Sequence, residues 1–427
     1  MMHNILRLIF LAMMINGYVI SQPIDSTLIL SNLIQELQQN NPNLESSYQN
    51  WQATKARVPQ AGALPDPMLG INLQNLPINS FRFDQEPMTG KQFFLVQKFP
   101  FPGKQGLQQK IAAQDTKISE MQYHEMKNQL VFELEANYFE LFYVDKAIET
   151  SEKNAALLLQ FTQIAETRYR VGKGLQQDVF KSQVEYSRIS DKLINLQQQR
   201  EVLEAQLNVL LNRPPGNFVG KTIQPEIPTF QANLSELIQL ADEHRPLLIS
   251  WQSVITQSRH KVQLANKSYL PDFSLGVAYT QREVLENGMG GVDFLSGMFN
   301  LSIPLYFWKK QQKNVEENRF NEISVRHFYE GVQQKLYGQL DITLSDIDKN
   351  RQRLDLYKNV IIPQASQALK SSLAAYQVDK VDFLTLVSNQ LILFNYELEY
   401  YRALSDYFKN IALLGVLVGT NLEKLGN

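Results

Sequence analysis

Leu64-Pro65-Asp66-Pro67 and Phe99-Pro100-Phe101-Pro102-Gly103-Lys104 bound the stretch that decides the fold of this chain. Two short alternating segments joined by a polar loop lie between the two motifs, and a long helical pattern follows them. The arrangement occurs again with Leu270-Pro271-Asp272-Phe273 and Ile303-Pro304-Leu305-Tyr306-Phe307. The shift is 271 − 65 = 206 at one motif and 304 − 100 = 204 at the other, which predicts a twofold internal repeat.

Composition excludes several classes of function. The chain has 427 residues and a net charge of −2, which argues against binding nucleic acid through bulk basicity. It has no cysteine, so neither disulfides nor cysteine zinc sites can form. Five scattered histidines do not suggest a metal site. We find no phosphate loop, His-Glu-x-x-His motif or nucleophile elbow, and therefore expect no cofactor, no bound metal and no enzyme activity.

The N-terminus has the pattern of a secretory signal. Arg7 supplies positive charge, an apolar run follows to Ile15, and Val19 and Ser21 are small enough for a cleavage site. We expect residues 1–21 to be a signal peptide; the alternative is a buried N-terminal helix. No other stretch has the ~18 apolar residues that a spanning helix needs. If the mature chain enters a membrane, it must therefore do so by strands.

Four segments alternate with a period of two, which is typical of strands with one apolar face. We expect these strands at residues 68–74, 92–99, 273–280 and 298–303. The second is less regular because Phe93, Phe94, Leu95 and Val96 are contiguous. A soluble half-buried sheet has the same pattern. Strands of eight to eleven residues with small polar residues on one face also fit a transmembrane barrel.

Two long helical hairpins complete the repeats. From Lys104 to Tyr169 the helical pattern is unbroken, and ~65 residues of helix span about 100 Å. The first hairpin is expected over about 104–212 and the second over about 309–418, with a first short helix capped by Ser26-Thr27. The apolar seam of the last helix keeps heptad steps at Leu384, Val387, Leu391, Phe394, Leu398 and Tyr401.

These elements define the expected domain organisation. A first repeat covers residues 22–216, with its β-hairpin at about 68–99. A linker follows at 217–232, and a second repeat covers 233–427, with its β-hairpin at about 273–304. Four strands cannot close a barrel, and an open edge in lipid costs several kcal/mol for each unpaired group. Several copies must therefore contribute. Two copies would give eight strands with an interior filled by side chains, and three would give twelve strands with room for a water-filled lumen.

The two hairpin turns are the candidate sites, because threefold symmetry would place each residue three times around an opening. Their charged residues are candidates for a gate, and the alternative is a set of solvated helix ends. The small and apolar residues are candidates for contact with a partner helical hairpin. The gate candidates are Arg168, Arg170, Lys173, Asp178, Asp379, Lys380 and Asp382; the contact candidates are Val171, Gly172, Gly174, Val378 and Val381.

Taken together, these features resemble the TolC-type outer-membrane efflux channel family. The resemblance rests on the twofold repeat, on Tyr169-Arg170-Val171-Gly172 and Tyr376-Gln377-Val378-Asp379, and on Gln176-Gln177-Asp178-Val179. It covers essentially the whole mature chain. The motifs around Asp66 and Lys104 resemble most the outer-membrane subunits of heavy-metal cation efflux systems of the RND type. The sequence departs from the family where well-known members carry acidic residues beyond the second turn, since Thr385 and Ser388 stand there.

The resemblance implies a mainly α fold with a membrane β-barrel. Three chains would form a twelve-stranded barrel in the outer membrane, continued by a periplasmic α-barrel. It implies the exit duct of a tripartite pump, with a periplasmic adaptor (membrane fusion protein) and an inner-membrane transporter as partners and outer-membrane lipid around the strands. The expected cargo is small toxic solutes, above all heavy-metal cations. The alternatives are a duct for type I protein secretion or multidrug efflux and, more remotely, a periplasmic coiled-coil scaffold.

Overall fold

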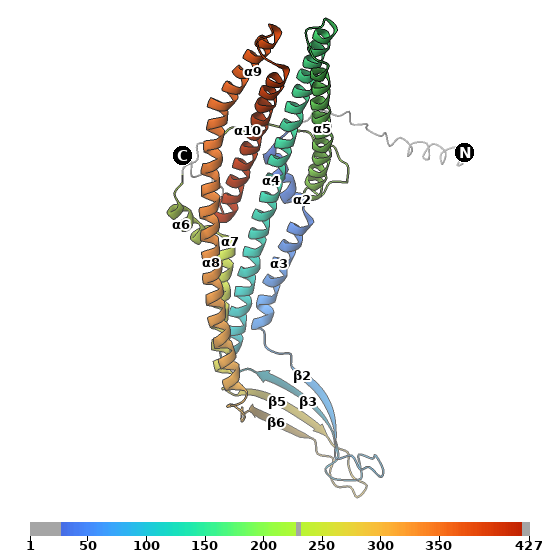
Figure 1. Cartoon of the computed structure of the whole chain (residues 1–427). Coiled ribbons are helices and arrows are strands. Elements are labelled where there is room, and N and C mark those ends of the chain that lie inside the picture. The colour runs from blue at the N-terminus through green and yellow to red at the C-terminus, as the bar shows by residue number, and fades with distance from the viewer. Residues whose placement is uncertain (1–26, 228–231, 421–427) are drawn as a thin grey trace, which may run out of the picture. The chain divides into compact units, whose positions relative to one another are not determined.

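The computed structural model describes residues 27–227 and 232–420, and the described chain is mainly helical (Figure 1). The expected signal peptide at 1–21 and part of the expected linker lie outside the described residues. The chain forms two compact units, each of which takes segments from both sequence repeats. The long helices α4 (Lys104–Arg170) and α8 (Gln311–Leu356) contribute to both units.

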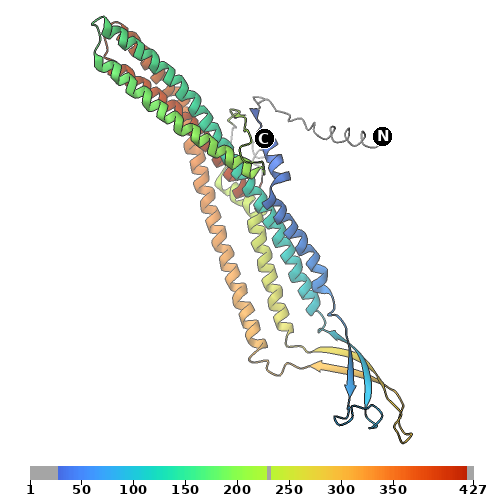
Figure 2. The same ribbon diagram turned by 90° about the vertical axis from the view of Figure 1, so that its right-hand side faces the viewer.

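The first unit is built on two helical hairpins. The C-terminal part of α4 and α5 (Gln176–Leu210) form one, and α9 (Ile362–Gln377) and most of α10 (Phe383–Val418) form the other. The hairpins lie side by side (Figure 2). Gln390 on α10 donates to Asn154 Oδ1 on α4 at 2.9 Å. The apolar core between them includes Leu134, Leu141, Phe142, Leu158, Phe161, Leu207, Leu386, Val387 and Leu404.

A small sheet joins the ends of the first repeat. Strand β1 (Thr27–Leu28) pairs in parallel with β4 (Lys221–Thr222), and α2 (Leu30–Asn40) follows it. The hydroxyl of Tyr138 donates to the Leu28 carbonyl at 3.1 Å and accepts from the Ile223 amide at 3.2 Å. The expected helix start at Ser26-Thr27 is therefore wrong by a few residues, because the backbone of residues 27–28 pairs with the linker segment instead.

The second hairpin contains a π-helical turn, η1 (Tyr357–Ile361), between α8 and α9. The amide of Ile362 bonds to the Tyr357 carbonyl, five residues back. Pro363 follows at once; it has no N–H, and its ring would collide with the carbonyl four residues earlier in a regular helix. The wider turn accommodates the proline without ending the helix.

The heptad seam of α10 begins at a different residue from the one expected. Leu384 is 62% exposed, whereas Phe383 and Leu386 are buried. Helix α10 begins at Phe383, whose ring lies 5.5 Å from the ring of Tyr376. This aromatic contact sets the buried face of the first turn. The later positions Val387, Phe394 and Leu398 are buried, as the heptad spacing predicts.

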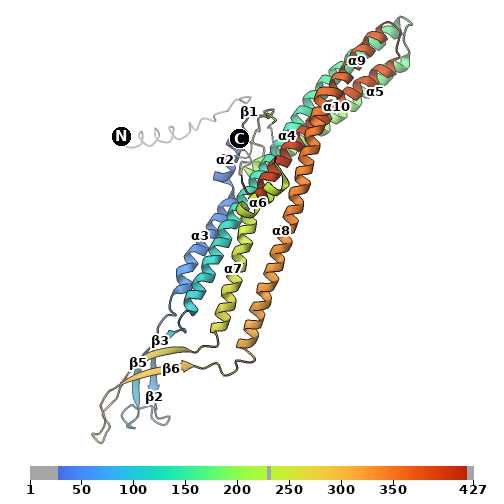
Figure 3. The same cartoon turned by 90° about the vertical axis from the view of Figure 1, so that its left-hand side faces the viewer.

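The second unit contains helices and the large sheet. Helices α3 (Pro42–Gly62), α7 (Pro246–Lys267) and the N-terminal parts of α4 and α8 lie side by side (Figure 3), and α6 (Leu234–His244) precedes α7. Arg245, between α6 and α7, bonds to Glu125 on α4 at 3.1 Å, with both side chains buried. Gly419 lies against the backbone of Arg245, and a Cβ there would come within 2.6 Å of Arg245 Cα.

Four antiparallel strands form a single sheet in the order β2-β3-β5-β6. They are β2 (Met68–Gln74), β3 (Gly90–Phe99), β5 (Asp272–Gln281) and β6 (Phe294–Ser302). All four expected strands are present, and the last begins four residues earlier than expected. The pairing of β3 with β5 joins the two repeats, and β2 and β6 are left as open edges.

The register gives the sheet two different faces. Paired residues such as Ile71, Phe93 and Tyr279 share an apolar face, which is largely exposed. The opposite face is mostly small or polar, and its large apolar residues are Met68, Phe94, Val96, Phe294 and Met298. A Cβ at Gly70 would come within 2.4 Å of the Phe94 ring, and one at Gly276 within 2.9 Å of Val96 Cγ2. The contiguous apolar run in β3 thus fills the space above two glycines of neighbouring strands.

Among the described helices, none is both long enough and apolar enough to cross a membrane.

Glu140 provides a test of the first unit. It accepts from Arg402 at 2.7 Å and from Lys409 at 2.8 Å. Burial alone would raise the pKa of Glu140, but these two cations lower it below the ordinary value. Glu140→Gln should lower the free energy of unfolding at pH 7 by roughly 1.5–3 kcal/mol, the range for hydrogen bonds to charged groups. Circular dichroism melting in detergent measures this loss.

The loss should depend on pH in a defined direction. Because the folded pKa is depressed, the contribution is present above the unfolded value of ~4.3 and disappears as the pH falls through the folded pKa. The melting temperatures of wild type and variant should therefore converge in acid. Glu152→Gln, an exposed change on the same helix, should match wild type throughout. A difference for Glu140→Gln that does not change with pH would contradict the assignment.

Candidate functional site

Two helical turns, Val171–Gly174 and Val378–Val381, bring most of the candidate residues together in the first unit. Both have the same hydrogen bonds. The amide of Lys173 bonds to the Arg168 carbonyl at 2.9 Å, and the amide of Lys380 bonds to the Ala375 carbonyl at 2.9 Å. A bond across five residues after a left-handed residue is the Schellman helix ending.

The left-handed residue is Gly172 in the first turn, with φ +73°, and Asp379 in the second, with φ +61°. They are equivalent in the repeat, since 379 − 172 = 207. Glycine adopts this conformation without strain, and aspartate is among the few other residues that tolerate it. The repeat has therefore kept the backbone of the turn while placing a carboxylate in one copy only.

Arg168 joins the two turns. Its guanidinium donates to the carbonyls of Tyr376 and of Lys173, pairs with Asp379 and lies over the Tyr376 ring, 4.6 Å from its centre. The Arg168 side chain is 14% exposed and that of Asp379 is 62% exposed. An ion pair with so exposed a partner contributes only about 0–1 kcal/mol. The Arg168–Asp379 ion pair therefore orients the two turns relative to each other, and a free-energy change of about 1 kcal/mol is enough to break it.

The returning helices begin differently. Asp382 caps α10, because its Oδ1 accepts from the Thr385 amide at 2.7 Å. The hydrogen bonds from Thr385 lower the pKa of Asp382. Helix α5 has Leu175 at the corresponding position and no side-chain cap. Asp178 lies half-buried in its first turn, where burial raises the pKa of this carboxyl.

The other predicted residues lie on the surface of the turns. Arg170, Lys173 and Lys380 are exposed. Val171 is 62% exposed and Val378 61% exposed, whereas Gly174 and Val381 are half-buried. Tyr376, which sequence reasoning did not select as a site residue, is buried beneath Arg168. The repeat identifies Tyr376 as the counterpart of Tyr169, but it does not predict which of the two tyrosines lies beneath an arginine.

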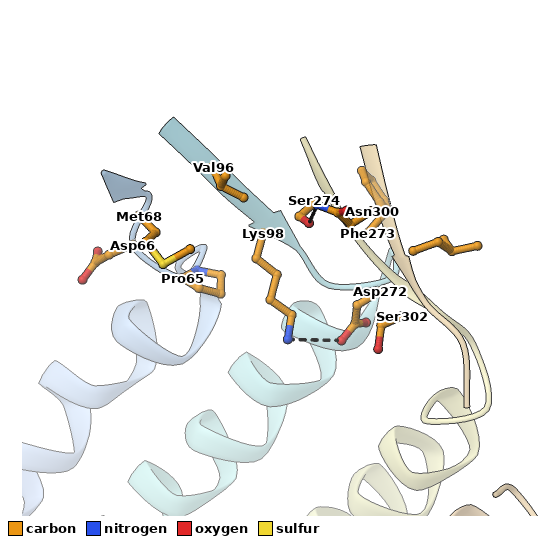
Figure 4. A pocket seen from close by; sticks show the side chains of 11 residues that line it. Pro65, Asp66, Met68, Val96, Lys98, Asp272, Phe273, Ser274, Asn300 and Ser302 are labelled. Atoms are coloured by element: carbon orange, nitrogen blue, oxygen red, sulfur yellow. Dashed lines mark hydrogen bonds and ion pairs between the residues drawn. The ribbon is translucent and has the colours of Figure 1, made fainter. Parts of the chain in front are cut away.

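A hollow of about 440 Å³ lies in the second unit, on the mostly small and polar face of the sheet near the helix ends (Figure 4). Its polar lining includes Asp66, Lys98, Asp272, Ser274 and Asn300. Lys98 Nζ approaches Asp272 at 3.9 Å. Among the described residues, no group of three or more acidic or histidine side chains could hold a metal ion.

Comparison with known proteins adds a decisive observation. The family model described as outer membrane efflux protein matches residues 33–213 and 237–419, so two matched segments cover most of the chain. The chain belongs to the outer membrane efflux protein family. It is thus an efflux protein of the outer membrane, and the resemblance seen in the sequence is confirmed.

Individual relatives are distant. The cobalt-zinc-cadmium resistance protein CzcC of Cupriavidus metallidurans is 17% identical over 391 residues, covering 89% of this chain and 87% of CzcC. Toxin and drug export protein A of Aggregatibacter actinomycetemcomitans is 21% identical over 226 residues. That match covers 52% of this chain and only 48% of the relative's length.

Solved structures agree on the fold. The outer membrane protein VceC of Vibrio cholerae superposes with a TM-score of 0.77, covering 92% of this chain and 96% of VceC, at 16% identity. A similarity at this identity shows the fold alone. The predicted mainly α fold of this channel family is thereby confirmed.

The turn geometry predicts how Gly172 responds to substitution. No atom lies within 4 Å of a Cβ built there, so only backbone strain matters. Gly172→Val should destabilise the first unit by about 1–2 kcal/mol, the cost of a left-handed non-glycine residue. Gly172→Asn should cost less, because a short polar side chain tolerates this conformation. Thermal unfolding in detergent compares the two, and equal losses would contradict the conformational explanation.

Proposed function

We propose that this chain is the exit duct of a tripartite efflux pump, which carries small toxic solutes, chiefly heavy-metal cations, from the periplasm to the exterior. The observation that supports it most is the family match over both repeats, together with the relationship to CzcC along 89% of the chain. The solute passes unchanged, so no catalytic step and no cofactor belong to the proposal.

The proposed working form is a homotrimer. Each chain has one four-stranded sheet with two open edges, β2 and β6. In lipid, unpaired edge groups cost several kcal/mol each, so neighbouring copies must pair them. Three copies give twelve strands and a lumen wide enough for water, and the hairpins continue this barrel into the periplasm as an α-barrel.

The two faces of the sheet fit this assembly. Leu69, Ile71 and Leu295 are 76%, 67% and 80% exposed on the apolar face, and we assign this face to outer-membrane lipid. The opposite face, with Ser274 and Asn300, is assigned to the lumen. Alternation of apolar and small polar residues between lipid and lumen is typical of outer-membrane strands.

The two turns are assigned to the periplasmic end. Val171, Gly172, Gly174, Val378 and Val381 form a small, apolar surface that suits tip-to-tip docking with a hairpin of the periplasmic adaptor. The adaptor connects the duct to an inner-membrane transporter. The charged residues of the turns, with Arg168 and Asp379 at their centre, are proposed to govern opening.

The choice between cargoes needs a genetic experiment. CzcC is named for cobalt, zinc and cadmium resistance, whereas toxin and drug export protein A is named for export of toxins and drugs. Deletion of the gene should lower tolerance to Co²⁺, Zn²⁺ or Cd²⁺ severalfold, measured as the minimal inhibitory concentration, and the plasmid-borne gene should restore it.

The control is a panel of dyes, detergents and antibiotics in the same strains. Sensitivity confined to that panel would support the multidrug or toxin-export alternative. Unchanged tolerance to both panels, in a strain that expresses the protein in its outer membrane, would contradict export of toxic solutes.

The gate assignment gives a second prediction. Arg168→Ala removes the contacts that join the turns, so single channels in planar bilayers should show a higher conductance or longer open times. Arg170→Ala is the comparison variant: this neighbouring gate candidate is exposed and its loss leaves the Arg168 contacts in place, so conduction should change less. If both variants conduct as wild type does while keeping the same heat-resistant oligomer, the gate lies elsewhere.

A further inference from the structure

Asp272 holds together the two repeats within one chain. It is the first residue of β5, and its Oδ1 accepts from the Phe101 amide at 2.9 Å and from Lys104 Nζ at 2.7 Å. Lys104 also donates to the Leu270 carbonyl at 2.9 Å. The Leu-Pro-Asp motif of the second repeat thus binds the turn that leads from β3 into α4 in the first repeat.

Asp66 is the counterpart of Asp272 in the first repeat, since 272 − 66 = 206. Its surroundings differ. Asp66 is exposed, and within the described chain it makes no hydrogen bond or ion pair of the kind that Asp272 makes. Figure 4 shows its carboxylate directed away from Lys98 and Asp272. The aspartate of this motif therefore accepts hydrogen bonds from the protein in the second repeat and faces solvent in the first.

The turn after β6 is the counterpart of the turn that Asp272 binds. The Lys104 amide bonds to the Phe101 carbonyl at 3.0 Å, and the Lys309 amide bonds to the Tyr306 carbonyl at 3.1 Å. By this hydrogen-bond geometry, Tyr306 corresponds to Phe101 and Lys309 to Lys104, at an offset of 205 that places one extra residue after Pro304. Lys309 is exposed, and Tyr306 is 70% exposed.

The strand order indicates which molecule can bring Asp66 to the turn after β6. Within the chain, β3 of the first repeat pairs with β5 of the second, and this brings Asp272 to the turn after β3. Repeating that antiparallel relation at the open edges places β2 of another copy beside β6. Asp66 of that copy then arrives at the turn after β6, opposite in charge to Lys309.

We propose that Asp66 of one copy binds the Tyr306 amide and the Lys309 ammonium of a second copy of this chain, as a latch between subunits. The latch rests on the proposed homotrimer and adds to it the contact that fixes how neighbouring copies meet. Lys310, next in sequence and also exposed, can replace Lys309 as the cation.

A charge exchange tests the latch in the full chain. Asp66→Lys should lower by several degrees the temperature at which the oligomer dissociates on semi-native gels, because it places like charges together. The triple variant Asp66→Lys with Lys309→Glu and Lys310→Glu should regain most of that shift. Glu86→Lys, an exposed charge reversal in the loop between β2 and β3, is the matched control and should leave the temperature unchanged.

The absence of cysteine permits a second measurement. With Asp66→Cys and Lys309→Cys in one chain, a short bis-maleimide should link chains into covalent dimers and trimers. The pair Glu86→Cys and Lys309→Cys should not. A wild-type oligomer with neither charge rescue nor cross-linking would overturn the latch and leave the proposed function standing. A monomeric wild-type protein would instead contradict the proposed function itself.

Discussion

The need to pair every backbone N–H and C=O in the sheet governs this molecule. Each chain has four strands in this sheet, where β3 pairs with β5 at the centre while β2 and β6 remain open edges. The repeat provides two β-hairpins, and each can pair with another strand on both of its edges. The antiparallel strand pairing that joins the two repeats can therefore also join two copies of the chain. Within one chain, the pairing of β3 with β5 is thus an example of the contact that we propose between neighbouring copies.

The two repeats keep a common backbone and differ in the chemistry placed on it. Both helical turns end in the same hydrogen-bond pattern, yet Gly172 stands where Asp379 stands and Ala375 where Arg168 stands. One ion pair therefore joins the turns within a chain, and no equivalent pair can form between the other two positions. The two hairpins therefore have the same turn geometry and different charges at equivalent positions.

Sequence reasoning recovered the features that depend on local patterns. Period-two alternation located the strands, and the uninterrupted run from Lys104 located the longest helix. It could not find that Tyr376 lies beneath Arg168, because burial of one tyrosine in a repeated pair depends on tertiary packing. It also took Ser26-Thr27 for a helix cap, since pairing with a segment almost 200 residues away leaves no local signal. The capping role of Asp382 is local and was overlooked in favour of a gate role.

The π-helical turn ahead of Pro363 has a consequence for the evolution of the duplicated rod. Residues 311–377 and the helix 104–170 have the same length, since 377 − 311 + 1 = 67. The wide turn uses one residue more than a regular turn, which rotates everything beyond it by roughly 100°, the angle of one residue in an α-helix. The offset between the repeats rises from 204 at Pro100 and Pro304 to 207 at Tyr169 and Tyr376, so the second repeat has 207 − 204 = 3 more residues between these positions. A π-helical turn can take up one such residue inside a continuous helix, so the second rod tolerates an added residue without a break.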